Sequence, residues 1–136
     1  MITFKKKRME EEFALVDRKL QKIVFAMEAV MDALYEKTLV ITSVYRDNYR
    51  STHYYYRAVD IRSSDLTHEQ CMDMTRALNL IFPYGKAAYE TVLYHNAGSG
   101  WHFHVQIKAE NDGKRKLPEK LGRNYRENKN ASGMEV

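Results

Sequence analysis

Two separate stretches of the chain carry side chains that could hold a metal ion. His53 and Asp60 belong to the first stretch, and the pair His102 and His104 belongs to the second. Neutral imidazole nitrogen and carboxylate oxygen are preferred zinc ligands, and three such ligands with an open fourth position are typical of a catalytic site. The metal in such a site activates water and polarises a scissile carbonyl, which is the chemistry of hydrolysis. Taken singly, these residues also fit ordinary loop and strand-edge positions.

The spacing of the second stretch favours one shared site. Residues two apart on a strand point to the same face, so His102 and His104 would enter one cleft while Phe103 and Val105 face the other way. An isolated His-x-His pair is also common on ordinary strands, and it therefore needs support from the rest of the sequence.

The N-terminal half is predicted to form a helix followed by strands. Apolar residues at three- and four-residue steps predict an amphipathic helix from about residue 10 to residue 36. Asp17 could break this helix and cap its second segment. Stretches rich in β-branched residues predict strands over residues 39–44 and 58–61, the second with Asp60 facing away from the core.

The remaining elements complete a small sheet. Thr67 and Gln70 form a capping-box pattern for a helix that reaches about Phe82. Two further strands, over residues 89–94 and 102–108, are joined by a glycine-containing loop that suits a hairpin. The predicted class is therefore α+β, a small antiparallel sheet with helices packed on one side.

The length and the composition indicate one domain with a polar tail. The chain has 136 residues, of which 44% are hydrophobic and 29% charged, as is usual for a globular protein. We expect a single domain over residues 1–109 and an extended or disordered tail over residues 110–136. The tail is basic and the net charge is +4, which leaves nucleic acid, an anionic glycan polymer and simple solubility open as explanations.

The sequence also predicts the cellular compartment of the protein and the role of its one cysteine. The basic residues 5–8 precede Met9 and three glutamates instead of an apolar segment, and no apolar run reaches the roughly 18 residues that span a bilayer. We therefore expect synthesis in the cytoplasm without a signal peptide and no membrane span. The single cysteine, Cys71, excludes an internal disulfide and is interpreted as a buried small hydrophobe instead of a nucleophile.

The first stretch resembles a known motif. Ser51, His53, Ala58 and Asp60 match the pattern Ser-x-His-x-x-Gly-x-Ala-x-Asp of zinc peptidases in the D-alanyl-D-alanine carboxypeptidase and dipeptidase group. That group includes phage L-alanyl-D-glutamate endolysins and the Hedgehog signalling domain. Residues 43–46 are similar to its Gly-Tyr-Arg segment. The resemblance covers roughly residues 39 to 108 and implies a Hedgehog/DD-peptidase-like fold.

The resemblance also implies roles for individual residues. It implies one zinc ion held by His53, Asp60 and His104. His102 would lie beside the metal, where it could hydrogen-bond the tetrahedral intermediate or help move a proton. Arg46 would stabilise oxyanion charge or bind a substrate carboxylate.

Three further residues are expected to contact the substrate. Ser51 could support the substrate or the ligand shell. Tyr45 and Trp101 could line a groove for an extended peptide or a sugar chain, since aromatic rings combine apolar faces with polar tips.

The chain departs from the motif at two positions. Tyr56 replaces the glycine, which could crowd the loop or give another turn. Trp101 stands where relatives often carry the acidic general base, three residues before the last zinc ligand. Candidates for the base are Glu90, His95 and His102, of which His102 is the favoured site residue.

The leading hypothesis is zinc-dependent hydrolysis of a peptide bond in peptidoglycan stem peptides, as in a phage or prophage lysin acting as a monomer. A phage holin could release such a protein to the cell wall. The alternative is a zinc-binding module without hydrolysis, which the missing acid favours. A nucleic-acid-binding protein is a third reading, supported only by the basic tail and the tyrosines.

Overall fold

The computed structural model describes residues 1–98 and 100–109, and the predicted tail over residues 110–136 lies outside them. Five strands form one sheet in the order β1-β2-β3-β5-β4. The strands are β1 (Ile2–Phe4), β2 (Leu39–Ser43), β3 (Ala58–Arg62), β4 (Val92–Asn96) and β5 (Trp101–Gln106). All neighbours pair antiparallel except β1 and β2, which are parallel. The predicted α+β class with a mostly antiparallel sheet is confirmed.

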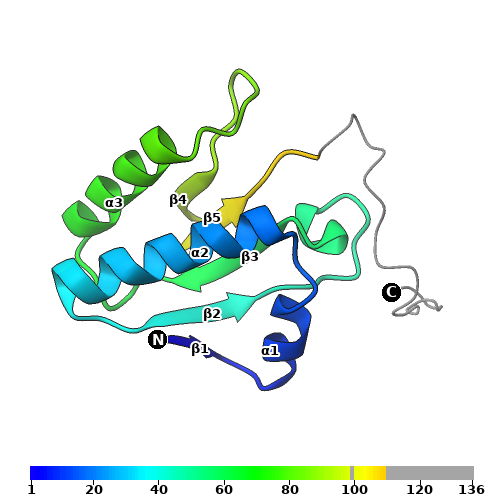
Figure 1. The fold of residues 1–136 in the computed structure, drawn as a ribbon, viewed down its shortest axis with the longest axis horizontal. Coiled ribbons are helices and arrows are strands. Elements are labelled where there is room, and N and C mark those ends of the chain that lie inside the picture. Colours follow the sequence, from blue (N-terminus) through cyan, green and yellow to red (C-terminus); the bar gives the residue numbers. More distant parts are fainter. Residues whose placement is uncertain (99, 110–136) are drawn as a thin grey trace.

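The helical elements lie between these strands. They are α1 (Arg8–Phe13), α2 (Arg18–Val30), the π-helical turn η1 (Met31–Tyr35), the 3-10 helix η2 (Thr52–Tyr55) and α3 (His68–Ile81). Figure 1 shows α2 running across the sheet and α3 lying along β4. No helix within the described residues is both long enough and apolar enough to cross a bilayer.

Local capping signals explain where the helices begin. The first helical segment ends at Phe13, and Asp17 caps the second, because its side chain accepts a hydrogen bond of 2.8 Å from the backbone N–H of Lys19. Thr67 and Gln70 form the predicted capping box at the start of α3, with reciprocal hydrogen bonds of 3.1 and 3.0 Å. The predicted break and the predicted capping box are both confirmed.

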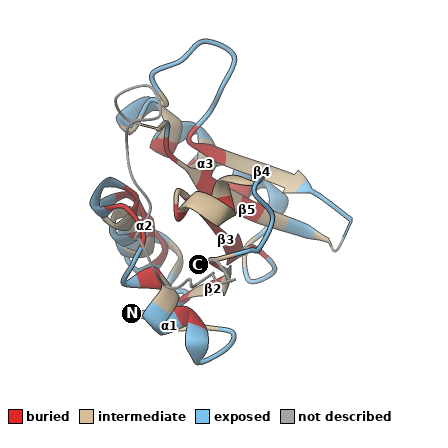
Figure 2. Cartoon of the chain, turned by 90° about the vertical axis from the view of Figure 1, so that its right-hand side faces the viewer, coloured by how far each residue is buried: buried red, intermediate tan, exposed pale blue. Residues whose placement is uncertain are grey.

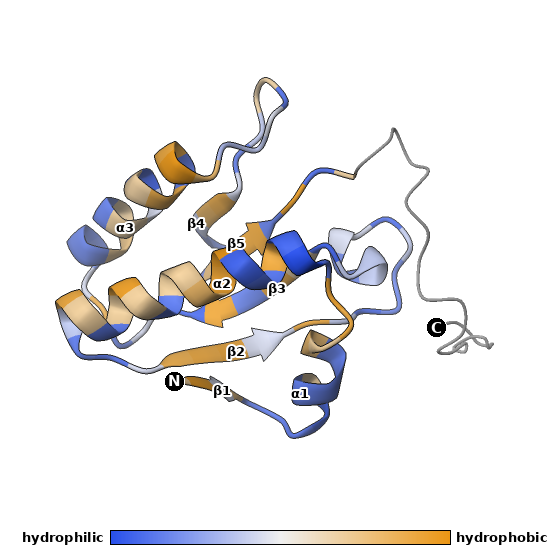
Figure 3. Cartoon of the chain, viewed as in Figure 1, coloured by the Kyte–Doolittle hydropathy of each residue, from blue (hydrophilic) through white to orange (hydrophobic). Residues whose placement is uncertain are grey.

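The core lies between the helices and one face of the sheet. Figure 2 shows buried residues along the strands and on the inner sides of the helices, and Figure 3 shows apolar stretches on β2, β3 and β5. Fully buried members of the core include Leu20, Ile23 and Met27 from α2, Cys71 and Leu78 from α3, and Ile61, Phe103 and Val105 from the sheet. The opposite face of β3 and β5 is therefore free to carry polar side chains.

Two strand predictions need correction. β1 was not expected, because a strand of three residues is too short to show an alternating pattern in the sequence. Its parallel partner β2 also lies far along the chain. β4 begins at Val92 and not at Tyr89. The side-chain amide of Asn79 bonds both backbone groups of Val92, at 2.8 and 2.9 Å, and this contact from α3 fixes where the strand starts.

Candidate metal centre

His53, Asp60 and His104 come together on the face of the sheet that α2 leaves uncovered. Their ligand atoms all lie within 4.8 Å of one another, so the group could bind a metal ion. Asp60 of β3 is directly opposite His104 of β5 in the strand register. His53 reaches them from η2, whose first turn is capped by the Ser51 side chain at 3.1 Å from the His53 N–H. Ser51 thus holds the turn that carries His53.

The backbone determines which nitrogen of His53 is available. Its Nδ1 lies 2.8 Å from the carbonyl oxygen of Val44. A carbonyl only accepts, so Nδ1 carries the hydrogen and Nε2 carries the lone pair. Nε2 is 3.3 Å from Asp60 Oδ1 and has no hydrogen-bond donor or acceptor partner, although the ring is 0% exposed.

The side chain of Gln106 determines which nitrogen of His104 is available. The Nε2 of His104 lies 3.0 Å from Oε1 of Gln106. The amide nitrogen of Gln106 donates to the backbone oxygen of Glu90 at 2.9 Å, which turns its oxygen toward the imidazole. His104 Nε2 is therefore protonated, and its Nδ1 lone pair faces Asp60 Oδ1 at 3.1 Å.

Two imidazole lone pairs thus converge on one carboxylate oxygen. Acceptors cannot satisfy one another, and they require either a proton or a cation between them. Two nitrogens and one oxygen are a donor set suited to zinc. Burial raises the pKa of Asp60, whereas His104 and His53 lower it below the usual range when their facing nitrogens carry hydrogens that the carboxylate accepts.

Arg46 occupies the other oxygen of the same carboxylate. Its guanidinium contacts Asp60 Oδ2, and its Nε donates to the Ser43 hydroxyl at 3.2 Å. Asp60 Oδ1 is thereby left as the oxygen that faces the two imidazoles. The guanidinium is about half exposed, so it also presents donors to the space above the centre.

A cavity of about 500 Å³ opens over this group. It is lined by the three candidate ligands and by Lys5, Ser43, Arg46, Ser51, Arg62, His95, Trp101 and His102, among others. The candidate centre therefore has an accessible side, where a fourth ligand or a substrate could enter.

Two further histidines lie side by side in the cavity wall. His102 Nδ1 is 3.2 Å from the carbonyl oxygen of Gly100, so its Nε2 is left as an acceptor, 3.9 Å from Asp60 Oδ2. His95 is its cross-strand partner, with ring centroids 4.8 Å apart. Burial lowers the pKa of His95, and the neighbouring His102 and His104 lower it further.

The structure brings only some of the other predicted site residues to the cavity. Glu90 is exposed, precedes β4 and does not line the cavity, so its side chain is not brought to the centre. Tyr45 packs against Tyr56 with ring centroids 5.1 Å apart and lies outside the cavity wall. Trp101 lies at the rim, where its ring also contacts His68 of α3 at 4.9 Å between centroids.

The tyrosine that replaces the motif glycine keeps a glycine-like backbone. Tyr56 ends η2 in the left-handed conformation, with φ 56° and ψ 33°. Only glycine adopts this region without strain. The ring is almost fully buried, at 5% exposure, and stacks on Tyr45. The Tyr56 ring is therefore accommodated in the core beside Tyr45, while its backbone ends the 3-10 helix that carries His53.

Sequence reasoning missed three residues around the centre. Gln106 and Arg62 each lie two residues from a candidate ligand on the same strand, so strand periodicity could have placed both on the face of the centre. Lys5 had no such signal, because it reaches the cavity only through the unexpected pairing of β1 with β2.

Comparisons with known proteins do not identify a family. No protein-family model matches the chain, and no curated protein matches it significantly. The function must therefore be inferred from the geometry of the centre and from the resemblance of its motifs.

Proposed function

We propose that this protein is a zinc-dependent peptidase that hydrolyses a peptide bond in bacterial peptidoglycan stem peptides, as a phage or prophage lysin-like enzyme with a Hedgehog/DD-peptidase-like fold. One observation carries the proposal. His53 Nε2 and His104 Nδ1 both face Asp60 Oδ1, at 3.3 and 3.1 Å, at the base of an open cavity. A centre with three such ligands and an accessible side is suited to catalysis.

The residues around the centre support hydrolysis. A zinc ion held there would activate water and polarise the carbonyl of the scissile bond. Arg46 directs guanidinium N–H groups into the cavity, where they can stabilise negative charge that develops on the carbonyl oxygen. His102 offers an unprotonated Nε2 on the same side, because Gly100 accepts the hydrogen of its Nδ1. It can therefore accept a proton from the attacking water and pass it to the leaving amine.

A zinc-binding module without hydrolysis is the second candidate. Among the described residues, no acidic side chain other than Asp60 lines the cavity. Trp101 occupies the position where related peptidases often carry an acidic base. This alternative makes the same prediction for metal binding and the opposite prediction for peptide cleavage.

Digestion of purified peptidoglycan distinguishes the two candidates. We expect the zinc-loaded protein to release fragments whose masses identify one cleaved peptide bond, as read by mass spectrometry. Removal of zinc with a chelator should abolish release, and added zinc should restore it. His104→Ala should be inactive, whereas His68→Ala, a histidine change outside the cavity, should retain activity. If fully zinc-loaded protein leaves the peptidoglycan intact, the peptidase proposal fails and the zinc-binding module remains as the function.

A further inference from the structure

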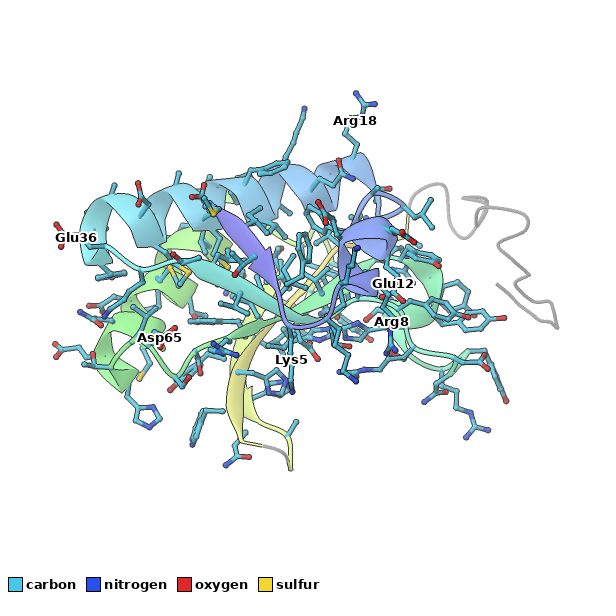
Figure 4. All side chains as sticks on the ribbon, turned by 90° about the horizontal axis from the view of Figure 1, so that it is seen from below. Lys5, Arg8, Glu12, Arg18, Glu36 and Asp65 are labelled. Carbon is cyan, nitrogen blue, oxygen red and sulfur yellow. The ribbon has the colours of Figure 1, made fainter. Side chains whose placement is uncertain are left out.

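A second cavity, of about 470 Å³, lies next to the cavity over the metal centre, and Trp101 lines both. Its wall comes from the loop between β3 and α3, from β4 and from the start of β5. Figure 4 shows Asp65, which belongs to this loop, beside α3 and away from α1. We call this cavity the aromatic pocket, and its described wall consists of Ser63, Ser64, Leu66, His68, Tyr94, Gly100 and Trp101.

Strand alternation separates the aromatic pocket from the metal ligands. His102 and His104 face the centre, so Trp101 and Phe103 point to the opposite face of β5, where Phe103 is part of the core. Tyr94 of β4 is opposite Phe103 in the register and lies on the same face, with ring centroids 5.4 Å apart. Among the described residues, Trp101 alone lines both cavities. A ligand in the aromatic pocket therefore does not need to touch the metal.

The Trp101 ring is fixed in place but not covered. The Tyr94 ring packs beside it with centroids 4.8 Å apart, and the edge of the His68 ring meets it at 83°. The Ser63 hydroxyl donates to the backbone oxygen of Trp101 at 3.0 Å. Trp101 nevertheless remains 49% exposed. A large ring that is already fixed can bind a ligand with little further loss of side-chain entropy.

The described wall of the aromatic pocket contains no Lys, Arg, Asp or Glu side chain. A phosphate or a carboxylate of a ligand would therefore lack a cationic partner there. Ser64 and Tyr94 supply hydroxyl groups, of which the Tyr94 hydroxyl also contacts Nδ1 of His68. Hydroxyl groups both donate and accept hydrogen bonds. The pocket is therefore suited to a neutral ligand that has an apolar face and polar edges.

A pyranose ring has both properties. Its axial C–H groups form an apolar face that can stack on an aromatic ring, and its hydroxyl groups lie around the edge, where they can form hydrogen bonds. We propose that the aromatic pocket binds a neutral sugar ring of a glycan, stacked on Trp101 and hydrogen-bonded by Ser64 and Tyr94. This proposal goes beyond the peptidase function and does not depend on it, because a zinc-binding module without hydrolysis can hold a glycan in the same way. Because Trp101 borders both cavities, a ligand with a sugar and a peptide can occupy both at once.

Trp101 is the only tryptophan of the 136-residue chain, so tryptophan fluorescence reports directly on the aromatic pocket. Tri-N-acetylchitotriose, a neutral sugar oligomer, is titrated into the zinc-loaded full chain. Adenosine, a planar ring, and choline, a cation that aromatic rings can bind, are titrated separately. We expect the sugar oligomer to change the fluorescence saturably and to bind at least about tenfold more tightly than either comparison compound.

Two variants test where the sugar lies. Trp101→Ala removes the stacking ring, and its binding is measured by calorimetry because it has no tryptophan. Ser64→Leu places a bulky side chain in the wall at an exposed position, keeps Trp101, and serves if Trp101→Ala does not fold. The matched control is Phe25→Ala, which removes a ring of similar exposure, 53%, from α2. We expect both pocket variants to weaken sugar binding by at least about tenfold and the control to bind like the parent.

Absence of saturable sugar binding in the parent, or unchanged binding in either folded pocket variant, would overturn the aromatic pocket as a sugar site. Adenosine or choline that binds more tightly and displaces the sugar would overturn the choice of ligand. The pocket supplies no group to the metal centre, so its variants should retain zinc. Sugar binding by zinc-loaded protein that leaves peptidoglycan intact would support this proposal while the peptidase proposal fails. Cleavage of peptidoglycan without sugar binding would give the reverse result.

Discussion

Gln106 and His104 form a pair in which the glutamine determines how the histidine can act. The Gln106 oxygen lies 3.0 Å from His104 Nε2, on the opposite edge of the ring from Asp60. The histidine must therefore present its Nδ1 lone pair to the carboxylate. The backbone carbonyl oxygen of Val44 lies 2.8 Å from His53 Nδ1 and orients the His53 ring in the same way. The centre is thus oriented by groups that do not themselves touch the proposed metal.

Removal of the Gln106 acceptor should weaken zinc binding. We expect Gln106→Ala to lower the affinity for zinc by about 10- to 100-fold, which is the usual effect of losing a hydrogen bond that orients a ligand histidine. Gln106→Glu keeps an acceptor and should remain within a few-fold of the parent. Competition with a chromogenic chelator measures both affinities. Equal affinity in the parent and Gln106→Ala would contradict the orienting role.

Loss of His102 should separate metal binding from catalysis. His102→Ala removes the unprotonated Nε2 from the cavity and leaves the three candidate ligands in place. We expect about one zinc per chain to be retained and kcat to fall by at least about 100-fold, as for loss of a group that transfers protons. Steady-state hydrolysis and metal analysis of one preparation provide the readouts. Unchanged kcat would remove His102 from the mechanism.

Glu12 should reduce the stability of the fold at neutral pH. Its side chain is largely buried, and burial raises its pKa above the ordinary value of 4.5. A raised pKa in the folded state means that folding favours the protonated form. The contribution of Glu12 to stability is therefore greatest below the unfolded pKa and is lost as the pH rises through the folded pKa.

Replacement of Glu12 by glutamine should remove this pH dependence. Glutamine can still accept from the Tyr45 N–H, which lies 3.4 Å from the Glu12 carboxylate. Glu12→Gln should be more stable than the parent at pH 7 and equally stable below about pH 4. Urea unfolding of zinc-free protein at both pH values tests this, with Glu10→Gln as an exposed control whose charge does not act on the pKa of Glu12. A constant difference across this pH range would show that titration is not the cause.

Substitutions of Tyr56 should separate backbone strain from packing. Tyr56→Gly relieves the left-handed backbone but removes a buried ring, and it should be less stable by about 2–4 kcal/mol. Tyr56→Ala removes the same ring and keeps the strain, so it should lose about 1 kcal/mol more. Chemical unfolding measures both differences. A glycine variant as stable as the parent would show that the ring contributes little.

Much of the fold could be predicted because its signals are local. The break at Asp17 and the capping box of Thr67 depend on residues a few positions apart, and both occur where the sequence indicates. The alternating pattern of β5 likewise predicts that His102 and His104 share a face. Each of these predictions needs only the chemistry of one short segment.

The features that were missed depend on contacts between distant segments. The parallel pairing of β1 brings Lys5 to the cavity from the start of the chain, and no local pattern reports it. The start of β4 is set by Asn79 from α3. Glu90 was expected on a strand beside the centre, but this later start leaves it exposed and outside the cavity wall.

Zinc titration of chelator-treated protein by isothermal calorimetry tests the proposed metal centre most directly. We predict about one zinc ion per chain, the number that three converging ligands can hold. His53→Ala, Asp60→Ala and His104→Ala should each abolish this binding, whereas His68→Ala should retain it. Absence of saturable zinc binding in the parent, or binding that survives all three ligand substitutions, would contradict the assignment of His53, Asp60 and His104 as a zinc centre.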